Sequence, residues 1–347
     1  MITKKEQLIA LLNLTEEEKR FYDTEEGMLP LKIPAHYASL IDTDNPNDPL
    51  RRQVVPSSEE LKIDERTTLD PLAEEEYGVT ERLIHRYPNR VAFLTTDICA
   101  IHCRHCFRRR FTATDQGPAT SDQIKEAAAY VAEHPQVKEI LFTGGDVLTL
   151  SNVQLKEMIT TFRAVRPDLI IRLCTRMPAA HPARITDELV AMIKSFDSAP
   201  FYLMTQFNHP NELSEQAVAA VARFVDRGIM ALNQSVLLSG VNDDVETLVL
   251  LSERLVQSRI VPYYLFQGDL VQSTAHLRVP LNKTLILEAE LRKRVSGLGM
   301  PTLAVDLPHG GGKVPLSTHY LVGEREKGVW EFITVDGKKR FYYDPVY

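Results

Sequence analysis

The chain has 347 residues, of which 44% are hydrophobic and 25% charged, enough to bury a large core in one big domain or one domain with an appendage. Its formal net charge of -7 argues against a nucleic-acid-binding surface, because phosphate binding needs a clustered positive field. No segment approaches the roughly 20 apolar residues that span a bilayer, and the charged start of the chain lacks the apolar core of a signal peptide. We therefore expect a cytoplasmic protein, and its four cysteines fit a reducing compartment.

The first 85 residues are rich in charge. Residues 4–12 and 15–23 have helical patterns, and a stretch rich in Pro and Asp follows at residues 45–49. We expect residues 1–85 to form a mainly helical N-terminal cap on the rest of the chain.

A repeat of strand and helix patterns follows. Short β-branched or aromatic runs recur near Leu94, Phe142, Leu173, Leu203, Leu232 and Leu265. Amphipathic, helix-like segments fill the intervals at residues 121–133, 153–165, 186–196, 214–226 and 245–259. The pattern predicts an α/β fold in which residues 86–300 form a partial (β/α)6 TIM-type barrel with right-handed crossovers. Active sites in such folds gather at the carboxyl ends of the strands.

Residues 301–347 contain one more strand-like run, at 302–306. Polar and apolar residues then alternate around Asp336 and Gly337, a typical hairpin signal. We expect a small C-terminal β hairpin or lid, preceded by a segment with a lysine on a glycine run.

Cys99, Cys103 and Cys106 have the spacing C-x3-C-x2-C, directly after the strand-like run at 91–94. Three thiolates can hold three irons of a four-iron cluster, and the fourth iron is then left for a ligand that is not protein. This placement predicts an iron-sulfur radical enzyme with these three cysteines as metal ligands.

A zinc site is the alternative for this stretch, because His102 and His105 lie among the cysteines. Structural zinc sites usually pair two Cys or His turns some distance apart, whereas the chain has one compact cluster and one other cysteine, Cys174. The ligand count favours iron and sulfur.

Two glycine-rich segments are further candidates. Gly144, Gly145 and Asp146 follow the second predicted strand, where free backbone amides and a carboxylate suit a ligand with an ammonium group. Lys313 follows three glycines, where it is either a solvated surface lysine or a lysine that forms a Schiff base with pyridoxal phosphate.

Together these residues resemble the lysine 2,3-aminomutase family of radical S-adenosylmethionine enzymes, which also hold pyridoxal phosphate. The resemblance covers residues 45–315. Its motifs are Arg86-Tyr-Pro-Asn-Arg90, the cysteine triplet with Phe-Arg-Arg-Arg110, Gly-Gly-Asp146, Phe207-Asn-His-Pro210, Asn233-Gln-Ser-Val-Leu-Leu-Ser-Gly-Val-Asn-Asp243, Pro262-Tyr-Tyr264 and Gly-Gly-Gly-Lys-Val-Pro315.

The resemblance implies a role for each of these positions. Lys313 would be the Schiff-base lysine, and Arg86 and Arg90 would hold the phosphate of the cofactor. Arg108 would grip the substrate carboxylate, a task suited to a planar fork of two donors. The pocket for S-adenosylmethionine would be formed by Gly144, Gly145, Asp146, Gln234 and Arg176.

Asp269 and Asp306 match the two family positions that flank the distal ammonium group in lysine-specific members. Two carboxylates indicate a cationic side chain, because unpaired like charges beside glutamate would cost several kcal/mol. Arginine and ornithine also carry a cationic side chain, so the choice of lysine as the substrate rests on the resemblance. Each aspartate could instead be a strand-end cap or part of a surface pair.

The sequence also departs from the family pattern. Gln206 and Phe266 stand where histidine and tyrosine are usual in the lysine enzymes. The chain lacks the C-terminal cysteine cluster that binds structural zinc in larger members, and Asp244 replaces the partner cysteine. Residues 45–53 also resemble the branch that isomerises a lysyl group for attachment to elongation factor P, but the chain keeps the aspartate and the glycines before Lys313, which favours a free amino acid.

The mechanism that the resemblance implies starts when the reduced cluster passes an electron to S-adenosylmethionine. The 5'-deoxyadenosyl radical then removes hydrogen from the β-carbon of a substrate held on pyridoxal phosphate, and the amino group migrates. We expect a flavodoxin- or ferredoxin-type electron donor and a homo-oligomer, with no nucleic-acid or membrane partner. The alternatives are an elongation factor P lysyl aminomutase, an enzyme for another basic amino acid, and a non-enzymatic iron-sulfur or zinc protein.

Overall fold

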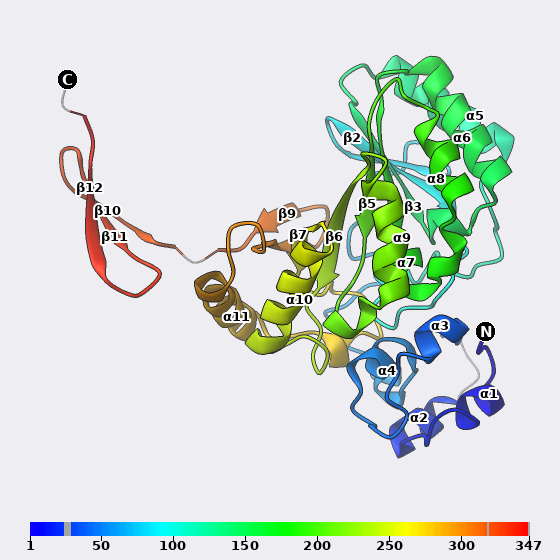
Figure 1. Cartoon of the computed structure of the whole chain (residues 1–347), viewed down its shortest axis with the longest axis horizontal. Coiled ribbons are helices and arrows are strands. Elements are labelled where there is room, and N and C mark those ends of the chain that lie inside the picture. The colour runs from blue at the N-terminus through cyan, green and yellow to red at the C-terminus, as the bar shows by residue number, and fades with distance from the viewer. Residues whose placement is uncertain (24–28, 318, 346–347) are drawn as a thin grey trace.

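The computed structural model describes residues 1–23, 29–317 and 319–345. Within these residues, a nine-stranded curved sheet follows the order of the chain from β1 to β9 (Figure 1). Neighbouring strands from β2 to β8 run parallel, and β1 and β9 pair antiparallel at the two edges. The strands are β1 Leu83–Tyr87, β2 Arg90–Thr96, β3 Glu139–Gly144, β4 Ile170–Thr175, β5 Phe201–Thr205, β6 Met230–Val236, β7 Ile260–Phe266, β8 Thr302–Leu307 and β9 Gly312–Pro315.

Helices join the successive parallel strands and confirm the predicted partial (β/α)6 barrel. They are α5 Ser121–Glu133, α6 Asn152–Val165, α8 Asp187–Lys194, α9 Glu215–Val225, α10 Val245–Gln257 and α11 Leu281–Arg294, with the short α7 Met177–Ala180 before α8. Capping boxes begin α5 and α6, where the side chains of Thr120 and Ser151 accept hydrogen bonds from the backbone of Gln123 and Gln154. Local sequence therefore fixes where these helices start.

The core lies between the sheet and the helices that cover its outer face (Figure 1). Side chains alternate along each strand, so one set enters this core and the other lines the inside of the barrel. In β3, Ile140 and Phe142 are buried in the core, whereas Leu141 and Thr143 line an internal cavity. Phe93, Phe142 and Phe162 pack together, with ring centroids 5.4 to 6.3 Å apart. The alternation thus separates the residues that stabilise the fold from those that face the cavity.

The N-terminal residues form a second hydrophobic cluster with short helices, α1 Lys5–Ile9, α2 Glu16–Phe21, α3 Ala35–Ala38 and α4 Pro49–Val54. Ile101, in the loop after β2, and Ala180, at the end of α7, belong to the same cluster. A buried ion pair also links the two parts, since Nη2 of Arg104 lies 2.6 Å from Oε2 of Glu60. The N-terminal segment is therefore packed against the barrel by both apolar and ionic contacts.

The C-terminal residues form a separate antiparallel sheet that lies beyond β9 and away from the barrel (Figure 1). The predicted hairpin is present as β11 Val329–Ile333 and β12 Lys339–Tyr343, and β10 Leu321–Glu326 adds a third strand. Short 3-10 turns complete the described secondary structure at Ser58–Leu61, Val147–Thr149, Pro182–Arg184, Pro210–Glu212 and Ala275–Leu277. In the described part of the chain, no helix has the length and apolar character needed to cross a bilayer.

Candidate active site

A cavity of about 440 Å³ lies inside the curved sheet, and the carboxyl ends of its parallel strands contribute to its wall. All of the site residues predicted from the sequence line this one cavity. They are Arg86, Arg90, Cys99, Cys103, Cys106, Arg108, Gly144, Gly145, Asp146, Arg176, Gln234, Asp269, Asp306 and Lys313. The fold therefore gathers residues that are up to about two-thirds of the chain apart.

The cysteine loop follows β2. Burial, and then repulsion between the cysteines, raises the pKa of the Cys99 and Cys106 thiols. The described residues contain no group of three or more His, Cys, Asp or Glu side chains arranged to hold a single metal ion. A four-iron cluster does not require such convergence, because each cysteine binds a different iron. The donor set of three thiols on one cavity wall therefore fits a cluster.

The histidines of the zinc alternative do not join the cysteines. Nδ1 of His102 donates a hydrogen bond to the Pro30 carbonyl oxygen, 2.8 Å away, in the N-terminal segment. His105 lines the cavity, but Nε2 lies 3.4 Å from the side-chain amide nitrogen of Asn208. Among the described residues, neither histidine forms with the thiols a group that could hold a single metal ion.

The glycine loop after β3 packs directly on the cysteine loop. A Cβ atom on Gly145 would lie 2.3 Å from the Ile98 carbonyl oxygen, and one on Gly144, whose φ is +107°, would lie 2.6 Å from that of Thr96. The Gly145 amide donates to the Thr96 carbonyl oxygen over 2.6 Å. Glycine is required here because any side chain would push the two loops apart.

The carboxylate of Asp146 is occupied by the protein itself. It accepts hydrogen bonds from the Thr175 hydroxyl at 2.6 Å and from the backbone amide of Arg176 at 2.8 Å. Burial raises the pKa of Asp146, and these hydrogen bonds oppose that shift. In this structure Asp146 braces the end of β4, and the predicted contact with an ammonium group remains a prediction.

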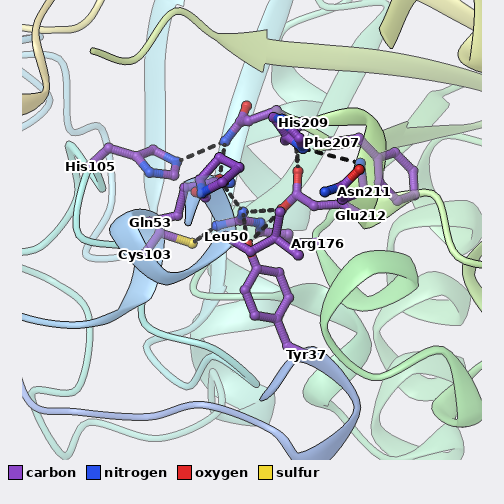
Figure 2. Close-up of polar contacts among 12 residues, drawn as sticks. Tyr37, Leu50, Gln53, Cys103, His105, Arg176, Phe207, His209, Asn211 and Glu212 are labelled. Atoms are coloured by element: carbon purple, nitrogen blue, oxygen red, sulfur yellow. Dashed lines mark hydrogen bonds and ion pairs between the residues drawn. The ribbon is translucent and has the colours of Figure 1, made fainter. Parts of the chain in front are cut away.

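Arg176 lies at the centre of a buried polar network (Figure 2). Its guanidinium donates hydrogen bonds to Sγ of Cys103 at 2.7 Å, Oε1 of Gln53 at 2.6 Å and Oε1 of Glu212 at 2.5 Å. The Tyr37 hydroxyl also donates to Glu212 over 2.9 Å. Tyr37 and Gln53 come from α3 and α4, so the N-terminal segment fixes an arginine that contacts a candidate cluster ligand.

Lys313 lies on β9 directly opposite Asp306 of β8. Its Nζ donates to Oδ2 of Asp306 over 2.7 Å and lies 3.9 Å from the ring centroid of Phe266. The Tyr87 hydroxyl accepts a hydrogen bond from the Lys313 backbone amide. The lysine therefore belongs to the cavity wall, and the alternative of a solvated surface lysine is wrong.

Arg86 and Arg90 bring positive charge to the same region. Nε and Nη2 of Arg86 are buried and have no hydrogen-bond partner among the described residues, and Nη1 lies 3.9 Å from Oδ1 of Asp306. The guanidinium of Arg90 lies 3.8 Å from the ring centroid of Tyr87. Buried donors without partners are costly, so they indicate a site for a strong acceptor such as a phosphate group.

Asp269 lies in the segment that follows β7 and lines the cavity with Asp306. Burial, and then repulsion from Asp306, raises the pKa of Asp269 to about 7. Two carboxylates close enough to perturb each other favour a positively charged ligand group between them.

Arg108 and Gln234 also face the cavity, Gln234 from β6. The structure pairs Arg108 with Glu74, which the sequence reasoning missed; Nη2 of Arg108 lies 2.7 Å from Oε1 of Glu74. Burial disfavours the charge on Arg108, but the attraction of Glu74 raises its pKa overall.

The comparison with known proteins gives two family matches. Residues 93–251 match the Radical SAM superfamily, and residues 288–331 match the family described as Lysine-2,3-aminomutase. The L-lysine 2,3-aminomutase of Acetoanaerobium sticklandii is 41% identical over 328 residues, which cover 93% of this chain and 78% of that protein. The chain belongs to the lysine 2,3-aminomutase family.

Other relatives show the range of that family. The L-lysine 2,3-aminomutase of Clostridium subterminale is 40% identical, over 92% of this chain and 76% of its own. The glutamate 2,3-aminomutase of Clostridioides difficile is 34% identical, over 93% and 76%.

Membership of the family makes the protein a radical SAM 2,3-aminomutase, an isomerase that acts on an amino-acid substrate. The non-enzymatic alternative is therefore wrong. The radical SAM superfamily implies a four-iron cluster and S-adenosylmethionine, and pyridoxal phosphate is typical of the aminomutase family.

Proposed function

We propose that the protein is an L-lysine 2,3-aminomutase that produces β-lysine. The observation that carries the proposal is the contact between Nζ of Lys313 and Oδ2 of Asp306, at 2.7 Å, in a cavity that also contains Asp269. A primary alkylammonium group is what the far end of a lysine substrate would present, and here one already binds to Asp306. The pair of aspartates thus supports a substrate with a cationic side chain.

The same contact leads us to propose that the Asp306 carboxylate pairs in turn with two amines, that of Lys313 and that of the substrate. Asp306 holds Lys313 as an ammonium group, which has no lone pair with which to form a bond. A Lys313 nitrogen bonded to pyridoxal phosphate would not make this ion pair, and Asp306 would then be open to the distal ammonium group of an entering substrate. Phe266 and Tyr264, whose ring centroids lie 3.9 and 5.3 Å from Lys313 Nζ, exclude water on one side of this exchange.

The other residues of the cavity divide by charge. Cys99, Cys103 and Cys106 would hold three irons of the cluster, and Arg86 and Arg90 would bind the phosphate of the cofactor. Arg108 would bind the substrate carboxylate through a planar fork. When bound, these cofactors supply the 5'-deoxyadenosyl radical and the carbonyl group that carries the migrating nitrogen. The protein supplies their relative position, which is worth several kcal/mol of the barrier, roughly 7–11 in the best cases.

Charge separates lysine from glutamate as the substrate. The side-chain carboxylate of glutamate would approach the Asp269 and Asp306 carboxylates, a juxtaposition of like charges that costs several kcal/mol. Arginine, ornithine and the lysyl group of elongation factor P would each place a cation there. These are the alternatives that the experiment must separate.

The test is an anaerobic reaction of reconstituted protein with S-adenosylmethionine, pyridoxal phosphate and dithionite. Dithionite replaces the electron donor, which we propose is a flavodoxin or ferredoxin. Separate samples contain lysine, arginine, ornithine or glutamate, and products are identified by mass spectrometry after derivatisation. We expect a β-amino isomer from lysine alone. Formation of 5'-deoxyadenosine without rearrangement of lysine would refute lysine as the substrate, and an isomer of glutamate would refute the charge argument.

A further inference from the structure

Glu74 forms a two-point ion pair with Arg108 in the cavity wall. Oε1 of Glu74 accepts hydrogen bonds from Nε and Nη2 of Arg108, at 2.9 and 2.7 Å, and Oε2 lies 3.0 Å from Nε. Both side chains are largely buried, with 13% of Arg108 and 9% of Glu74 exposed. Nη1 of Arg108 donates to the Thr143 hydroxyl on β3 over 2.7 Å. Glu74 and Thr143 therefore hold the guanidinium from two directions.

The contacts with Glu74 and Thr143 determine which N–H groups of Arg108 remain available to a ligand. A guanidinium has five N–H groups in a fixed plane, one on Nε and two on each terminal nitrogen. Within the described residues, Glu74 takes the N–H of Nε and one N–H of Nη2, and Thr143 takes one N–H of Nη1. One N–H is left on each terminal nitrogen. A carboxylate can accept two parallel hydrogen bonds from a guanidinium, one to each of its oxygens.

We propose that Glu74 is a positioning residue that orients Arg108 so that the two remaining donors face the substrate carboxylate. The inference rests on the proposed function, in which Arg108 binds that carboxylate. Glu74 binds the side edge of the guanidinium, formed by Nε and Nη2. It therefore orients Arg108 without using the remaining N–H groups of the two terminal nitrogens. Its contact with Arg108 already restricts the rotation of the long arginine side chain. Binding of the substrate then costs less conformational entropy.

The segment that carries Glu74 is itself fixed. The Glu75 amide donates to Oδ2 of Asp70 over 2.9 Å, and Nη2 of Arg110 lies 3.1 Å from the same oxygen. Tyr77 of the segment lies so close to Gly310 that a Cβ atom there would be 2.5 Å from the tyrosine hydroxyl. These contacts keep the Glu74 carboxylate in place when no substrate is present, as a positioning role requires.

The experiment compares L-lysine with L-lysinamide, which lacks the carboxylate, in the wild type, Glu74→Gln and the control Glu75→Gln. The side chain of Glu75 is 76% exposed and pairs with Arg110, whose Nη2 also lies 3.7 Å from Oε2 of Glu74. In Glu74→Gln we expect KM for lysine to rise by about tenfold to a hundredfold, with a smaller change in kcat, because a loosely held fork must be ordered by the substrate. The values for lysinamide should be nearly unchanged, so the preference for lysine falls by the same factor. Glu75→Gln should retain the wild-type preference.

The outcomes separate the inference from the function on which it rests. A wild type that does not prefer lysine to lysinamide would overturn the role of Arg108 and the inference with it. If the wild type prefers lysine and Glu74→Gln fully retains that preference, the positioning role alone is overturned. A lower KM for lysine in Glu74→Gln would also overturn it, because Glu74 would then compete with the substrate for Arg108. Glu74→Asp provides a second test should Glu74→Gln not fold, because the shorter side chain draws its carboxylate away from Arg108 and should lower the preference at least threefold.

Discussion

The pKa of Asp269 gives the most direct test of the substrate site, because it predicts the sign and size of a pH dependence. Burial and Asp306 raise this pKa to about 7, so the carboxyl group is neutral in the unliganded protein below neutral pH. An ammonium group binds favourably only to the ionised form. The ionised fraction is about one-tenth at pH 6 and about one-hundredth at pH 5. Lysine should therefore bind about a hundredfold more weakly at pH 5 than at pH 8, with release of a proton on binding below pH 7.

Isothermal titration calorimetry of the reconstituted protein between pH 5 and pH 8 measures both effects. Two buffers with different ionisation enthalpies report the number of protons released. The side-chain ammonium of lysine does not titrate in this range, and Asp269→Asn shows the pH dependence that other groups, including the α-amino group of lysine, contribute. The steep part of the curve should be absent in Asp269→Asn. Equal pH dependence in the two proteins, or tighter binding at pH 5 than at pH 8, would refute the reasoning.

Three further changes test other parts of the site. Lys313→Ala should abolish turnover and leave no protein-bound cofactor after borohydride reduction; full activity would contradict its assigned role. Glu60→Leu removes the partner of two buried arginines and should lower the free energy of unfolding by about 3–5 kcal/mol in urea, whereas the more exposed Glu59→Gln should change it by less than about 1 kcal/mol. Gly145→Ala forces the cysteine loop away and should lower the iron content after reconstitution. Gly297→Ala, with open space around it, should not change the iron content, and equal iron contents in the two variants would refute the argument.

Much of the fold was predictable because its signals are local. The predicted helix at residues 121–133 coincides with α5, and the predicted strand centres fall within β2 to β7. Hydrophobic periodicity identifies each buried face, and the capping residues mark the helix starts. The position of the site followed from one topological rule, that parallel strands place their carboxyl ends at the same edge.

The partners of the site residues were not predictable in the same way. Arg176 contacts Gln53 across 123 positions and Arg108 contacts Glu74 across 34. An ion pair between distant segments leaves no periodic pattern, and the sequence contains many other carboxylates and amides with the same local properties. The role expected for Asp146 illustrates the same limit, because its acceptors are used by Thr175 and the backbone at the end of β4.

The N-terminal segment therefore contributes side chains to the candidate active site as well as packing against the barrel. Removal of Gln53 and Tyr37 would leave the Arg176 guanidinium buried beside Cys103 with Glu212 as its remaining carboxylate, and without Glu74 the Arg108 fork would lose its side-edge partner. A buried cation without sufficient partners either moves or admits water. Either change would alter the surroundings of the candidate cluster ligand Cys103 or of the proposed carboxylate site at Arg108. The barrel supplies the positions of the site residues and the Glu212 carboxylate beside Arg176, and the segment before it supplies the neutral partners Tyr37 and Gln53 of Arg176 and the Glu74 carboxylate beside Arg108.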